Sequence, residues 1–212
     1  MTLTSILKKV GMAVTGLALL GFLVIHLTGN FLLMKGPAAF NQYSAFLHST
    51  GVLLLLAEAG LVIFFLVHVL SGIRVTMENK KARPTDYAVK KTAGEATLFS
   101  RTMTVGGLII LIFVPVHVWM FKFGDASTAG GLWSLVMQEF QQPMTVAWYV
   151  VAMLAIGMHL SHGIGSAFQT LGILKPHWRL KLKHAGVAVG WAIALGFASL
   201  PVWAFLTGTK AG

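Results

Sequence analysis

Long apolar runs separated by polar connections dominate the chain. Five runs stand out, at Val10–Met34, Gly51–Val75, Thr102–Phe121, Met144–Thr170 and Ala185–Thr207. A helix needs about 17–25 residues to cross a hydrocarbon core, and each run is at least of that order. The pattern predicts an all-α fold, with residues 1–212 forming a single domain of five transmembrane helices. The longest connection, Thr76–Arg101, is too polar to span and has room for a short surface helix. We find no internal sequence repeat.

Composition supports an integral membrane protein. Hydrophobic residues make up 56% of the 212-residue chain and charged residues only 10%, against about 25% charged residues in ordinary soluble domains. The chain contains no cysteine, which excludes disulfides, iron–sulfur ligation and covalent haem attachment. Any metal must therefore be held by histidine or by oxygen ligands.

The net charge of +10 is explained by membrane topology. Of the 16 lysines and arginines, 13 fall before the first run, at the end of the second run, or in the connections after the second and fourth runs. The positive-inside rule makes these segments cytoplasmic, so we expect a cytoplasmic N-terminus and an external C-terminus. The basic face suits anionic lipid or a docked soluble partner, and we expect no nucleic-acid partner. These 13 residues are Lys8, Lys9, Arg74, Lys80, Lys81, Arg83, Lys90, Lys91, Arg101, Lys175, Arg179, Lys181 and Lys183.

Four consecutive runs carry histidine. His26 lies in the first run, His68 in the second, His117 in the third, and both His159 and His162 in the fourth. The first and third runs lead outward, so His26 and His117 fall at nearly equal depth in the outer half of the membrane. The second and fourth lead inward, which places His68 and one of the two later histidines in the inner half. The sequence predicts two histidine pairs at two depths.

Two stacked pairs are what two bis-histidine haems b require, because each haem iron takes one axial imidazole from each face of the ring. Bundle interiors are where such cofactors are held. The predicted pairs are His26 with His117 for an outer haem, and His68 with His159 or His162 for an inner one. Nearby glycines would let a porphyrin approach the backbone, although tight helix packing explains them equally well. They are Gly21, Gly29, Gly72, Gly163 and Gly165.

Three further polar residues are candidates for function. Arg74 follows His68 by six residues at the cytoplasmic rim, where a guanidinium could bind a haem propionate or anchor the helix end. Glu58 lies in the outer half of the second run, and ionisable groups inside a membrane are functional candidates. We interpret Glu58 as a quinone-site or proton-relay residue, with a structural hydrogen bond as the alternative. His48 is a weaker quinone-site candidate in the outer loop.

The histidine spacing resembles one cytochrome family and differs from another. The cytochrome b of quinol–cytochrome c reductases places two ligands fourteen residues apart on each of two helices, and no run here does so. Ligands placed one per helix resemble the five-helix, two-haem membrane anchor of succinate:quinone oxidoreductases and fumarate reductases. His26 and His68 are 42 residues apart, as are His117 and His159. The matching motifs are "IHLTGN" (Ile25–Asn30), "AFN" (Ala39–Asn41), "VHVLSGI" (Val67–Ile73), "FVPVHVW" (Phe113–Trp119) and "HLSHGIGSAFQTLG" (His159–Gly172).

The resemblance implies a respiratory electron-transfer role in a bacterial inner membrane. Such a subunit anchors a flavoprotein and an iron–sulfur protein to the cytoplasmic face and exchanges electrons with a quinone, usually menaquinone. The dicarboxylate site lies on a partner, so the chain would act as a subunit of a quinone-linked oxidoreductase. The family pattern selects His159 as the inner ligand and leaves His162 beside a haem edge or propionate. Some members carry a glutamate two residues before this ligand, where this chain has Gly157.

Two other classes of protein remain open. The chain could be the cytochrome b anchor of a hydrogenase, a formate dehydrogenase or a b561-like oxidoreductase, which also use histidines on several helices. A transporter or non-haem membrane scaffold is the non-redox alternative, and it would be colourless. The ordered motifs favour the succinate/fumarate family.

Overall fold

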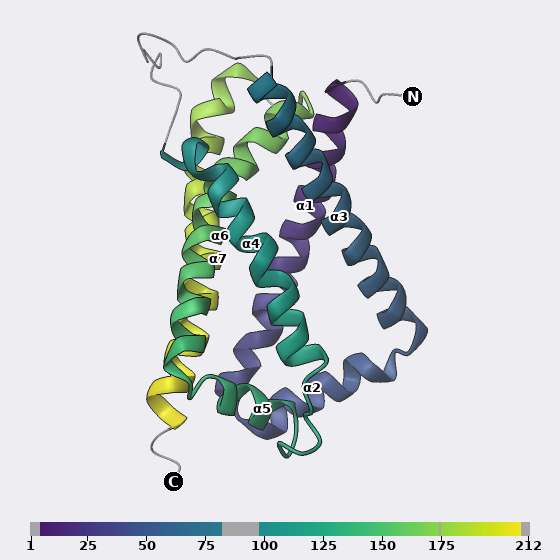
Figure 1. Ribbon diagram of the computed structural model, residues 1–212, viewed down its shortest axis with the longest axis vertical. Helices are drawn as coiled ribbons and strands as arrows, with labels where there is room; N and C mark the ends of the chain where they lie inside the picture. The colour runs from purple at the N-terminus through teal and green to yellow at the C-terminus, as the bar shows by residue number, and fades with distance from the viewer. Residues whose placement is uncertain (1–4, 82–97, 174, 209–212) are drawn as a thin grey trace.

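The computed structural model describes residues 5–81, 98–173 and 175–208, and the regular structure in these ranges is helical. Five long helices run roughly along the long axis of the molecule (Figure 1). Each is long and apolar enough to cross a membrane, which confirms the predicted five-helix transmembrane fold. They are α1 (Ser5–Asn30), α3 (Val52–Lys81), α4 (Leu98–Lys122), α6 (Pro143–Thr170) and α7 (Arg179–Gly208).

Two short helices lie in connections that the hydrophobic pattern left as loops. Helix α2 (Pro37–Ser49) and helix α5 (Leu132–Glu139) lie at the end of the bundle opposite the N-terminus (Figure 1). Glycines in a positive-φ conformation precede both helices, Gly36 at φ 101° and Gly131 at φ 116°, a conformation that glycine adopts without steric cost. Short 3₁₀ turns, η1 (Phe31–Lys35) and η2 (Pro176–Trp178), extend α1 and precede α7. The surface helix suggested for Thr76–Arg101 falls largely on residues 82–97, outside the described residues.

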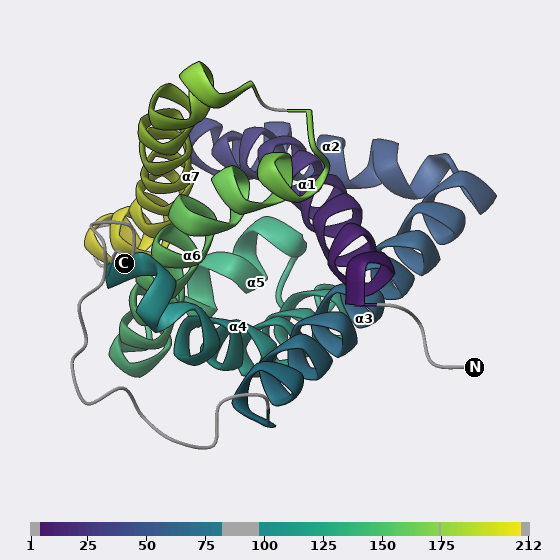
Figure 2. The ribbon, with the colours of Figure 1, turned by 90° about the horizontal axis from the view of Figure 1, so that it is seen from above.

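Helices α6 and α7 lie side by side along the bundle (Figure 1, Figure 2). Small residues on both helices allow this approach: a Cβ added at Gly190 of α7 would lie 2.9 Å from the backbone nitrogen of Ser161, and one at Gly157 of α6 would lie 3.0 Å from the Cβ of Ala194. Small residues at four-residue spacing let transmembrane helices approach at backbone distance. Helix α7 therefore packs directly against the backbone of α6.

Helix α3 is the least enclosed of the five. None of its residues is buried, and apolar side chains such as Leu53 and Leu55 are 69% and 64% exposed, as expected for a surface that faces lipid. Figure 1 shows α3 running beside α1 near the N-terminus and leaning away from the other helices toward α2. Two ion pairs tie it to its neighbours, Lys8–Glu78 to α1 and Lys122–Glu58 to α4.

One end of the bundle is basic. Helices α1 and α7 begin there and α3 and α6 end there, whereas the C-terminus lies at the opposite end (Figure 1). This arrangement agrees with the alternation of runs in the sequence; the assignment of this end to the cytoplasm stays a prediction. We call it the basic end, defined by Lys8, Lys9, Lys80, Lys81, Lys175, Lys181 and Lys183.

Candidate functional site

The structure brings His26 and His117 together. His26 of α1 and His117 of α4 have ring centroids 5.8 Å apart and ring planes at 86°. We call them the outer pair, because they lie farther from the basic end. Aromatic rings surround this pair; they belong to Phe22, Phe113, Phe121, Tyr149 and Phe197.

A second pair lies nearer the basic end. His68 of α3 and His159 of α6 have ring centroids 6.1 Å apart and planes at 69°, and we call them the inner pair. Depth counted from the sequence did not decide whether His159 or His162 is the partner of His68. In the structure, the ring that lies against His68 is that of His159. Two glycines meet these rings: a Cβ at Gly16 of α1 would lie 3.0 Å from Cε1 of His68, and one at Gly107 of α4 would lie 3.7 Å from Cε1 of His159.

Hydrogen bonds orient two of the four imidazoles. The Nδ1–H of His68 donates to the carbonyl of Met12 at 3.0 Å, and Nδ1 of His117 is hydrogen-bonded to the hydroxyl of Tyr149 at 2.9 Å. Such contacts at one ring nitrogen fix the ring and leave Nε2 for a metal, as is usual for histidine ligands.

The other two imidazoles are less firmly held. The amide nitrogen of Asn30 lies 3.3 Å from Nδ1 of His26. The Nδ1 of His159 is buried and makes no hydrogen bond of normal geometry to the described residues. The backbone of Met103 of α4 nevertheless lies close enough to interact with this ring, so His159, like His68, has a backbone neighbour on the adjacent helix.

The ring separations fit a metal held between the imidazoles. A bond from imidazole nitrogen to a transition metal is about 2 Å long and the nitrogen lies ~1 Å from its ring centre, so two axial imidazoles on one metal have centroids about 6 Å apart. Both pairs lie at that separation.

The number of ligands fits haem better than a bare ion. Within residues 5–81, 98–173 and 175–208, no three His, Asp or Glu side chains gather in one place, so each pair offers a metal only two protein ligands. A porphyrin supplies four nitrogens in its plane and needs two axial imidazoles from facing helices. The residues present therefore fit haem b.

The two pairs follow a repeated spacing that the sequence analysis missed. An offset of 91 residues relates Gly16 to Gly107, His26 to His117 and His68 to His159. The same offset relates Met12 to Met103, whose backbone lies beside His159. Each pair is thus made of equivalent histidines from two structural halves, α1–α3 and α4–α6. The repeat is carried by positions and not by similar stretches of sequence, which is why it is visible only after the pairs are known.

The other predicted site residues lie around these pairs. His162 is half-buried, one turn closer to the basic end than His159, and Arg74 is exposed and forms no ion pair within the described part of the chain. Glu58 is paired with Lys122. His48 is exposed on α2, where its Nδ1–H donates to the carbonyl of Ser44 at 2.8 Å.

The predicted glycines have varied surroundings. A Cβ at Gly29 would meet the ring of Tyr43 at 2.6 Å, and one at Gly72 would lie 3.8 Å from the sulfur of Met12. At Gly21, Gly163 and Gly165 it would meet no atom within 4 Å. None of these five contacts a paired histidine; the glycines that do are Gly16 and Gly107.

The fold and the site together define an integral membrane protein of five helices with two stacked pairs of imidazoles. Residues 10–93 match the family model described as succinate dehydrogenase/fumarate reductase transmembrane subunit. The chain is 25% identical over 156 residues, 72% of each chain, to the succinate dehydrogenase cytochrome b558 subunit of Bacillus subtilis (strain 168). No solved structure matches it. The comparisons confirm the predicted resemblance to the transmembrane subunits of this family and a multi-pass location in a bacterial inner membrane.

Proposed function

We propose that the chain is the membrane anchor and electron-transfer subunit of a succinate dehydrogenase or fumarate reductase complex. It binds two haems b, the inner one through His68 and His159 and the outer one through His26 and His117. The observation that carries this proposal is the pair of ring separations, 5.8 and 6.1 Å, at two levels of one bundle. Gly16, beside the inner pair, and His26 are ten residues apart on α1, so the levels differ by about 15 Å.

The comparisons support the cofactor and the partners. The name of the Bacillus subtilis relative includes cytochrome b558, which implies haem b in that protein. The matching family is named for the transmembrane subunit of succinate dehydrogenases and fumarate reductases. We infer that a flavoprotein and an iron–sulfur subunit dock at the basic end, which faces the cytoplasm. The dicarboxylate chemistry belongs to these partners.

The residues of this chain hold and insulate the cofactors. When bound, haem supplies one-electron transfer. The Met12 carbonyl and the Tyr149 hydroxyl engage Nδ1 of His68 and His117 and leave Nε2 of each ring available, so these two residues would hold the haem iron through Nε2. The aromatic rings around the outer pair place apolar groups next to the imidazoles, and burial by apolar groups is among the means by which a protein tunes such a site.

Glu58 is the residue to which we assign proton exchange with quinone. Its carboxylate is half-buried on α3 and is paired with Lys122 of α4. Oxidation of a quinol releases protons, and a carboxylate at this depth is a group that can accept them. The quinone, menaquinone in our proposal, would bind on this side of the outer pair. His48 remains a weaker candidate for the same site, because it is exposed and its Nδ1–H is directed to its own helix.

Replacing each paired histidine by alanine tests the proposal. The full chain, purified from membranes, should show b-type absorption after reduction with dithionite. The variants His68→Ala and His159→Ala should each lose the same half of the signal, and His26→Ala and His117→Ala the other half. His184→Ala, which changes an exposed histidine at the start of α7, is the control. A colourless wild-type protein, or retention of both haems in His159→Ala, contradicts the ligand assignment.

A further inference from the structure

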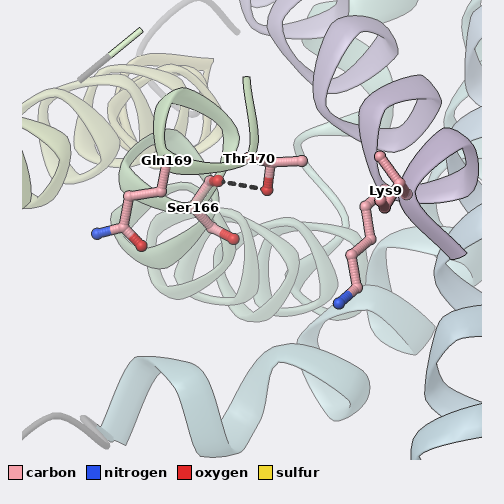
Figure 3. A pocket seen from close by; sticks show the side chains of 5 residues that line it. Lys9, Ser166, Gln169 and Thr170 are labelled. Carbon is pink, nitrogen blue, oxygen red and sulfur yellow. Dashed lines mark hydrogen bonds between the residues drawn. The ribbon is translucent and has the colours of Figure 1, made fainter. Parts of the chain in front are cut away.

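A pocket of about 320 Å³ opens at the basic end, between the start of α1 and the end of α6 (Figure 3). No part of the proposed function uses it. The pocket is lined by Ile6, Lys9, Ser166, Gln169 and Thr170.

The pocket is in register with the inner pair. Lys9 precedes Gly16, which packs on the ring of His68, by seven residues; Ser166 follows His159 by seven residues. Seven residues are almost two full turns, so side chains seven apart share one face of a helix and differ in height by about 10.5 Å. Lys9 and Ser166 therefore lie above the inner pair on the faces that carry it, displaced toward the basic end.

The lining is suited to an anion. It contains an ammonium group, two hydroxyls and an amide, and no carboxylate. The hydroxyl of Thr170 donates to the carbonyl of Ser166 at 2.8 Å, so its proton is already engaged. Lys9 and the Ser166 hydroxyl make no hydrogen bond or ion pair to the residues that the structure describes. In Figure 3, the Ser166 and Thr170 side chains of α6 lie on the side toward Lys9 of α1, whereas the amide of Gln169 points away from it.

We propose that this pocket binds a propionate of the inner haem, with Lys9 as its ion-pair partner and Ser166 as a hydrogen-bond donor. The inference rests on the proposed function, since it requires the inner haem. The height of about 10.5 Å above the pair is comparable to the reach from a porphyrin iron to the carboxylates at its rim. It assigns to Lys9 the role that sequence position suggested for Arg74 and His162.

The charge of Lys9 makes the proposal measurable. A cation near a haem disfavours the ferric form, which carries the extra positive charge. Lys9→Met should therefore lower the midpoint potential of the inner haem by about a tenfold change in its reduction equilibrium, or about 59 mV for one electron. Lys9→Arg retains the charge and should leave the potential near that of the wild type. Ser166→Ala should move the potential in the same direction by a smaller amount, because only a neutral donor is lost.

Redox titration of the full chain, followed by visible absorption, tests the proposal. The inner signal is identified as the one that His68→Ala removes, and Lys80→Met, at the basic end but outside the pocket, is the matched control. A lowered inner potential in Lys9→Met, with an unchanged outer potential, supports the assignment. An unchanged inner potential in both Lys9→Met and Ser166→Ala overturns it, even when both haems are present.

Lipid phosphate is the competing occupant. Loss of a bound anionic phospholipid from Lys9→Met, detected by mass spectrometry of the purified protein, together with an unchanged inner potential, assigns the pocket to lipid and overturns the haem proposal. Failure of the proposed function gives a different result, because the wild type itself then carries no haem.

Discussion

Gly16→Ala should damage the inner pair selectively. The added Cβ would lie 3.0 Å from Cε1 and 3.2 Å from Nδ1 of His68, whereas ordinary carbon contacts are about 3.5–4.0 Å. The ring must therefore retreat by about half an ångström. The His68 ring cannot do so freely, because its Nδ1–H is hydrogen-bonded to the carbonyl of Met12. Met12 lies on α1, one turn before Gly16.

The size of the effect follows from the cost of overpacking. Inserting a methyl group into a well-packed site typically costs about 1–3 kcal/mol. If this cost destabilises the haem-bound protein and not the haem-free one, the affinity of the inner pair for haem falls roughly 5- to 150-fold. The equivalent Gly107 offers a comparison, because a Cβ there would lie 3.7 Å and 3.9 Å from the ring of His159. Those are ordinary contacts, so Gly107→Ala should be tolerated.

The assay is the rate at which haem leaves the purified full chain for an excess of apo-acceptor protein, followed by visible absorption. Gly16→Ala should release the inner haem faster and the outer haem at the wild-type rate. Gly21→Ala, on the same helix with no atom within 4 Å of the new methyl, is the control for any change in α1 itself. Equal release rates for the inner haem in all three glycine variants would refute the reasoning.

Three other changes test different parts of the structure. Tyr149→Phe removes the hydroxyl bonded to the outer imidazole of α4, a net loss of about 1 kcal/mol, and should shift the potential of the outer haem alone in a redox titration. Gly190→Ala brings a methyl to 2.9 Å from the backbone of α6 and should lower the thermal midpoint in detergent, whereas Gly60→Ala, which meets nothing within 4 Å, should not. Glu58→Gln should slow quinone turnover with little change in that midpoint, because its ion pair is partly exposed and such pairs contribute at most about 1 kcal/mol.

The long helices could be predicted from the sequence because the bilayer imposes a length on each apolar run. The depths of the histidines followed from the same runs, since 1.5 Å of rise per residue converts position into height. His26 and His117 fell at one depth by this count, and their rings lie 5.8 Å apart in the structure. Depth alone left His159 and His162 unresolved, because residues three apart differ in height by only about 4.5 Å and the choice depends on rotation around the helix.

The contacts of individual glycines could not be predicted. Gly21 and Gly16 lie on the same apolar helix, and only Gly16 meets a histidine. What separates them is which neighbour packs on each face of α1, and that depends on the tertiary arrangement. The short helices α2 and α5 were missed for a related reason: with 13 and 8 residues they are too short to span, and polar connections carry no length constraint.

The repeat of 91 residues also relates two polar residues that lie at the depth of the outer pair. It relates Tyr149 of α6, which bonds the outer histidine of α4, to Glu58 of α3. Both residues precede an inner histidine by ten positions, so both lie at the depth of the outer pair. One half of the structure thus places a neutral phenol at this depth and the other a carboxylate, which pairs with Lys122. The ion pair joins α3 to α4, and in our proposal the same carboxylate exchanges protons with a quinone, which a haem iron held by two imidazoles does not do. Glu58 is therefore the residue at the depth of the outer pair on which the quinone proposal rests, and Lys9, at the other end of the bundle, is the residue on which the anion-site proposal rests.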